Sequence, residues 1–78
     1  MRKAELHKRF DKLTEILSLS SGLGYFSPLQ RTCLHQERSA IMQAINRINY
    51  ADEEAVTPRY QIPAHLEQKV KKVINDFK

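Results

Sequence analysis

The sequence predicts an all-α fold, a small three-helix bundle built as a single domain over residues 1–78. Three segments carry apolar residues at the three- and four-residue spacing that places them on one face of a helix. No segment alternates apolar and polar residues as a strand would. Serine, glycine and proline residues separate the segments, as is typical of helix ends. We therefore expect helices over residues 2–20, 28–49 and 63–77, arranged as a bundle or as a helical hairpin with a docked third helix.

The first predicted helix carries its apolar stripe on one side and charges of both signs on the others. Glu5 lies four residues before Arg9, a spacing that allows pairing along a helix. The helix should end in a run of serines before Gly22, because glycine readily adopts the left-handed conformation that follows a helix. The stripe is formed by Leu6, Phe10, Leu13, Ile16 and Leu17.

The second predicted helix has the strongest start signal in the chain. Ser27 can cap the helix, Pro28 suits the first helical position, and Gln30 can complete a capping box. This helix is the longest element and should lie at the centre of the bundle. Its apolar face is expected to contain Leu29, Cys33, Leu34, Ala40, Ile41, Ala44, Ile45 and Ile48.

The connection to the third helix is long and begins with acids. A capping residue followed by acids over residues 52–55 predicts one short helical turn. Pro58 and Pro63 each force the preceding residue into extended backbone, and Pro63 can start the third helix. The apolar face of that helix is formed by Leu66, Val70, Val73, Ile74 and Phe77.

A chain of this length can bury only one small core, which typically supplies about 3–5 kcal/mol of stability. The single cysteine, Cys33, excludes an internal disulfide, reads as a small apolar core residue and favours a cytoplasmic location. No apolar run approaches the roughly 18 residues of a membrane span, and no apolar segment of a signal peptide follows the basic start. The core should include Leu13, Leu17, Ile41, Ile45, Val70 and Val73.

The sequence lacks the residue patterns of common enzymes. His7, His35 and His65 fall one per predicted helix, and His35 projects opposite the apolar stripe, so the three cannot converge. There is no zinc-binding spacing and no phosphate-binding loop. We therefore predict no catalytic residue, no metal ligand and no cofactor.

Glu37 interrupts the apolar stripe of the second helix. A lone ionised carboxylate in a dry core is very costly, so Glu37 must be paired, hydrated or at an edge. One interpretation pairs it with a cation from the first or third helix. The other places it at the contact of a homodimer, where it would reach Arg31 or Arg38 of the second copy. The small size of the domain and a second helix longer than the third, which leaves part of its stripe uncovered, favour the dimer.

The function most consistent with these features is that of a non-enzymatic binding module. Such an adaptor, inhibitor or accessory regulatory protein, of cytoplasmic or phage type, would act through protein–protein interaction. Tyr25 and Phe26 either close the end of the bundle or dock the partner. The net charge of +4 keeps two alternatives open, a nucleic-acid-binding accessory protein and an oligomer that holds a small anionic ligand, such as a nucleotide, between subunits. The predicted partner-binding residues are Tyr25, Phe26, Arg31, Glu37 and Arg38.

Overall fold

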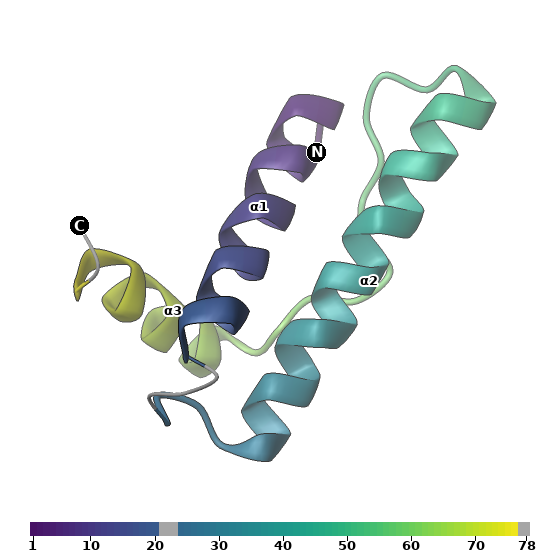
Figure 1. Ribbon diagram of the computed structural model, residues 1–78. Helices are drawn as coiled ribbons and strands as arrows, with labels where there is room; N and C mark the ends of the chain where they lie inside the picture. The colour runs from purple at the N-terminus through teal and green to yellow at the C-terminus, as the bar shows by residue number, and fades with distance from the viewer. Residues whose placement is uncertain (21–23, 77–78) are drawn as a thin grey trace.

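The computed structural model of the protein describes residues 1–20 and 24–76, with the side chains of residues 19 and 20 excepted. Within these residues the fold is all-α, as predicted, with helices α1 (Lys3–Ser20), α2 (Pro28–Ala51) and α3 (Ala64–Asp76). Figure 1 shows α1 and α2 side by side as an antiparallel hairpin, with α3 across the end where the two are joined. The roles predicted for Gly22 and Phe77 lie outside the described residues.

The core lies where the three helices meet. The six residues predicted to form the core from all three helices are buried. Cys33, also predicted as a core residue, is half-buried and packs against the core. Leu29 is the exception to the predicted stripe of α2, since it is 80% exposed. Leu29 precedes Leu34 by five residues, and five steps of about 100° turn its side chain about 140° away from the buried face. The fully buried large side chains are Leu6, Leu13, Ile16, Leu34, Ile41, Leu66 and Val70.

The capping box predicted at the start of α2 is present. The Oγ atom of Ser27 accepts a hydrogen bond from the backbone N–H of Gln30 at 3.2 Å, and Oε1 of Gln30 accepts one from the N–H of Ser27 at 3.0 Å. Pro63 caps α3 instead of starting it, because its carbonyl accepts bonds from the N–H groups of Leu66 and Glu67 at 3.1 and 3.0 Å. α3 therefore begins one residue later than expected.

The helical turn predicted over residues 52–55 is wrong. Asp52 adopts a left-handed conformation, with φ 57°, and ends α2 instead of opening a new helix. The chain then becomes extended, and Ala55 forms an isolated antiparallel bridge with Arg2. The acids of this segment therefore lie at the end of α2, all exposed to solvent.

The connection between α2 and α3 returns along the hairpin and covers part of its core (Figure 1). The backbone N–H of Val56 donates a hydrogen bond to the carbonyl of Met1 at 2.9 Å. The amino group of Met1 donates one to the carbonyl of Val56 at 3.1 Å. Val56 and Pro58 are buried, and Val56 belongs to the same buried cluster as Ile48 near the end of α2. The apolar stripe of α2 is thus covered within the chain at its Ile48 end, which removes one reason for expecting a dimer. None of the helices in the described residues is long and apolar enough to cross a membrane.

Candidate functional site

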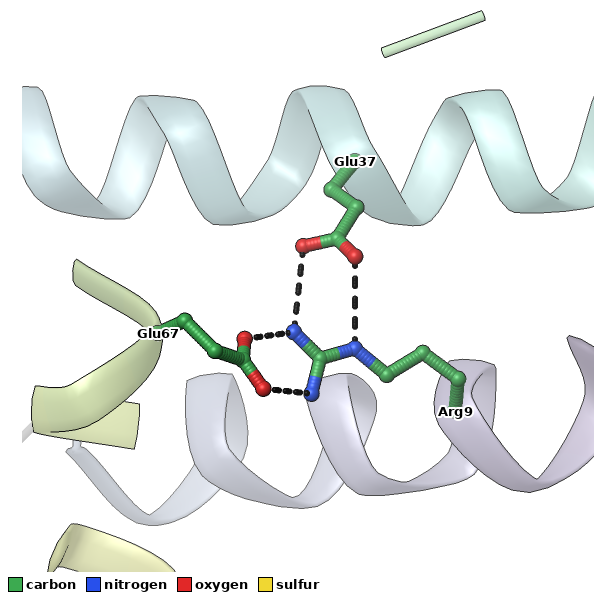
Figure 2. Close-up of polar contacts among 3 residues, drawn as sticks. All are labelled: Arg9, Glu37 and Glu67. Carbon is green, nitrogen blue, oxygen red and sulfur yellow. Dashed lines mark hydrogen bonds and ion pairs between the residues drawn. The ribbon is translucent and has the colours of Figure 1, made fainter. Parts of the chain in front are cut away.

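Arg9 lies between two carboxylates that come from the other two helices, in a cluster that we call the Arg9 clamp (Arg9, Glu37 and Glu67). The Nε and Nη2 atoms of Arg9 donate to Oε1 and Oε2 of Glu37 at 3.2 and 3.3 Å. Nη1 donates to Oε1 of Glu67 at 3.1 Å, and Nη2 also donates to Oε2 of Glu67. Figure 2 shows that each carboxylate faces one edge of the guanidinium. One arginine therefore joins all three helices.

The clamp is partly enclosed by the fold. The Glu37 side chain is 8% exposed, whereas those of Arg9 and Glu67 are 17% and 30% exposed. Burial acts to lower the pKa of Arg9, but the hydrogen bonds and negative charges of Glu37 and Glu67 outweigh it, so this pKa is raised. Arg9 consequently stays charged at any physiological pH. The clamp is suited to holding helices together and not to carrying protons.

The structure pairs Glu37 within its own chain and not with a second copy. A cation of the first helix meets the carboxylate, as one of the two interpretations predicted. With 6% of the residue exposed, Glu37 is buried and satisfied within its own chain. The reason for placing it at a subunit contact beside Arg31 or Arg38 therefore falls away.

The clamp forms one wall of an open cleft of about 470 Å³, which we call the clamp cleft. The remaining wall is mostly apolar and comes from the start of the chain, α2, the connection before α3 and the first residue of α3. It consists of Met1, Ile41, Pro58, Gln61, Ile62 and Ala64.

A second cleft, of about 510 Å³, lies between α3 and the α1–α2 connection, and we call it the tip cleft. Tyr25 supplies the side of the connection. Among the charged side chains, Lys69 and Lys72 are positive and Asp76 is negative, so their formal sum is +1. The residues of α3 that line the tip cleft are His65, Gln68, Lys69, Lys72, Val73 and Asp76.

Lys69 is held in place at the tip cleft by two contacts, one with the first turn of α2 and one with the connection that precedes it. Its Nζ atom donates to Oε1 of Gln30 at 3.0 Å and lies 5.2 Å from the centroid of the Phe26 ring. Gln30 is itself part of the capping box with Ser27. The positive charge at this cleft is therefore fixed by the fold.

The predicted partner-binding residues do not form one site. Tyr25 lines the tip cleft and is 36% exposed, whereas Phe26 is 5% exposed and closes the end of the core. Arg31 is half-buried. Arg38 donates from Nε to Oγ1 of Thr14 at 2.7 Å, with its guanidinium 4.4 Å from the ring centroid of Phe10. Arg38 thus fastens α2 to α1, and only Tyr25 of the predicted set lies at a cleft with an exposed aromatic surface.

The groups with chemical reactivity are dispersed over the described part of the chain. His7, His35 and His65 are exposed on three different helices. No three His, Cys, Asp or Glu side chains among the described residues could hold a metal ion together. Cys33 is half-buried, and its hydrogen bond with Tyr60 raises the pKa of the Tyr60 hydroxyl.

Sequence reasoning missed four site residues, which are Arg9, Glu67, Lys69 and Lys72. Arg9 precedes Phe10 and so borders the apolar stripe of α1, which was a usable signal, because a buried Glu37 requires a cation. Nothing in the sequence chose between Arg9 and its neighbours Lys8 and Lys12.

Comparisons with protein-family models, with curated proteins and with solved structures found no match.

Proposed function

We propose that this protein is a non-enzymatic binding module that acts through protein–protein interaction, with the tip cleft as its binding surface. The observation that carries the proposal is the composition of that cleft. It joins a partly exposed aromatic ring, Tyr25, to the basic residues Lys69 and Lys72 in one hollow of about 510 Å³. Tyrosine is one of the residues that most often anchor protein interfaces, and nearby charge favours a partner of opposite charge.

The surroundings of the tip cleft supply further apolar and positive surface. Gln30 holds Lys69, which places the first turn of α2 beside the cleft. Leu29, 80% exposed, belongs to that same turn. The start of a helix also carries partial positive charge from its free N–H groups. The chemistry that fits is therefore an acidic protein segment bearing an aromatic or aliphatic side chain.

A protein partner is favoured over nucleic acid because several arginines are committed within the chain. Arg9 is bound by two carboxylates, Arg38 by Thr14, and the Nη2 atom of Arg47 donates to the carbonyl of Thr57 at 2.8 Å. A nucleic-acid surface needs a row of cations that can reach phosphates. The tip cleft instead mixes two lysines with an acid. The same commitments of Arg38 and Arg47 weigh against an anionic ligand held by arginines of α2.

The test is a binding titration with a fluorescent acidic peptide that contains aromatic residues. We expect the wild-type protein to bind it, and Lys72→Glu and Tyr25→Ala each to weaken binding about tenfold, equivalent to 1.4 kcal/mol. Lys71→Glu is the matched control, because Lys71 is an exposed neighbour on α3 that does not line the cleft. A peptide with lysines in place of its acids should not bind.

Two results would overturn the proposal. Equal losses in Lys71→Glu and Lys72→Glu would show that general charge, and not the tip cleft, governs binding. Binding of a random DNA duplex with steep salt dependence, without binding of the peptide, would assign the basic surface to nucleic acid.

A further inference from the structure

We propose that the tip cleft of one molecule receives the end of α2 of a second copy, so that the chain associates head to tail. This inference rests on the proposed function, that the tip cleft binds an acidic protein segment, and it names the segment. We call that segment the acidic end (Tyr50, Asp52, Glu53 and Glu54).

The acidic end has the chemistry that the tip cleft favours. Tyr50 is 92% exposed, the most exposed of the large apolar and aromatic side chains in the described residues. Asp52, Glu53 and Glu54 follow it, all exposed, and together carry three negative charges. The left-handed backbone of Asp52 ends the helix there, so the ring and the carboxylates lie within five consecutive residues at the end of α2. The acidic end thus combines an exposed aromatic ring with charge opposite to that of Lys69 and Lys72.

The two surfaces lie at opposite ends of the molecule. Figure 1 shows α3 and the α1–α2 connection at one end of the hairpin and the end of α2 at the other. α2 has 24 residues and therefore spans about 36 Å, and the molecule is 40 Å in its longest dimension. One chain cannot place its acidic end in its own tip cleft. The contact must form between copies.

Charge favours this geometry over a symmetric dimer. Two tip clefts facing each other would bring like charges together, as would two acidic ends, whereas a head-to-tail contact pairs three carboxylates with a cleft of formal charge +1. A head-to-tail contact leaves one free surface at each end, so association continues beyond two chains unless the assembly closes into a ring. A small, polar contact of this kind is weak and should be lost at high salt.

Two variants, each with one of the two surfaces blocked, provide the test. The tip-blocked variant carries Tyr25→Ser and Lys72→Gln, and the end-blocked variant carries Tyr50→Ser, Glu53→Gln and Glu54→Gln. Each variant retains one intact surface. All substituted sites except Tyr25, which is only 36% exposed, should tolerate substitution without loss of stability. Circular dichroism checks that both variants keep their helices.

Sedimentation velocity at low salt is measured over rising concentration. The mass of the wild-type protein should rise beyond two chains, whereas each variant alone should stay at 9.1 kDa. An equimolar mixture should form a complex of two chains and stop, because only one pair of intact surfaces remains. Self-association of either variant at the wild-type level would overturn the inference, and so would a wild-type protein that stays monomeric throughout.

The same experiment separates this inference from the proposed function. A monomeric wild-type protein whose tip cleft still binds the acidic aromatic peptide would refute head-to-tail association alone. A wild-type protein that neither self-associates nor binds the peptide would refute both the head-to-tail association and the proposed function. A dimer that forms equally in all three proteins would point to a symmetric contact elsewhere on the molecule.

Discussion

Arg9 donates two hydrogen bonds to Glu37, from Nε to Oε1 and from Nη2 to Oε2, and so fastens α1 to α2. The carboxylate is the only charged or polar side chain that is buried in the described residues. The carboxylate can stay ionised in this buried position only because Arg9 pairs with it.

Arg9→Leu should destabilise the protein by about 3 kcal/mol, because it leaves a buried carboxylate without its partner. The midpoint of chemical denaturation measures the effect. The double variant Arg9→Leu with Glu37→Leu should recover most of the loss, since apolar residues replace a buried ion pair at little cost. Arg59→Leu, at an exposed arginine, is the control and should change stability by less than about 0.5 kcal/mol. Failure of the double variant to recover would show that Glu37 has another role.

Leu34→Ala and Leu29→Ala should differ sharply, although both lie in the first turns of α2. Leu34 is fully buried, and its truncation should cost about 3 kcal/mol through lost burial and the cavity that remains. Leu29 is 80% exposed and should tolerate alanine within about 0.5 kcal/mol. Thermal denaturation of the two variants is the measurement. Equal destabilisation would mean that Leu29 packs against a surface of a second molecule.

Ser27→Ala should lower stability by about 1 kcal/mol, because it removes the side-chain oxygen that accepts the N–H of Gln30. Ser39→Ala, at an exposed position within the same helix, is the matched control and should be neutral or slightly stabilising. Urea denaturation compares the two. An effect of Ser39→Ala as large as that of Ser27→Ala would contradict a specific role for the cap.

Tyr60 should make stability depend on alkaline pH. Its hydrogen bond with Cys33 is the main cause of its raised pKa, with smaller contributions from burial and from the charges of Cys33 and Glu37. The folded protein therefore holds this proton more tightly than the unfolded chain does. The associated stability is complete below about pH 10, the ordinary tyrosine pKa, and is lost as the pH rises through the folded pKa.

Tyrosinate absorbance in a Tyr25→Phe, Tyr50→Phe background reports the titration of Tyr60 alone. Cys33→Ala should return the pKa of Tyr60 toward its ordinary value. An unchanged titration would show that the two side chains do not interact in solution.

The fold was largely predictable because its helices have regular apolar faces and clear end signals. The spacing of Leu13 and Leu17 or of Val70 and Val73 reports burial directly, and Ser27 marks the start of α2. The segment after Asp52 was not predictable in the same way. A capping residue followed by acids favours the start of a helix. The observed path instead pairs Ala55 with Arg2, which is far away in sequence, and no local pattern reports such a contact.

The site was less predictable than the fold, because its contacts join residues with no regular spacing. The burial of Glu37 signalled that a cation was needed, but the identity of that cation depends on how α1 and α3 are oriented. The tip cleft likewise appears only when α3 is placed beside Tyr25. Periodicity identifies the buried face of each helix and says nothing about which exposed faces adjoin.

The Arg9 clamp also implies an order in which the chain folds. Its two arms span very different stretches of chain, 28 residues from Arg9 to Glu37 and 58 residues from Arg9 to Glu67. Closing a loop of twice the length costs about 0.6 kcal/mol more in chain entropy. We infer that the hairpin of α1 and α2 forms first and that α3 docks last and opens first. Native-state hydrogen exchange should show lower opening free energies for the amides of α3 than for those around Leu34 and Ile41, and the reverse order would contradict the inference.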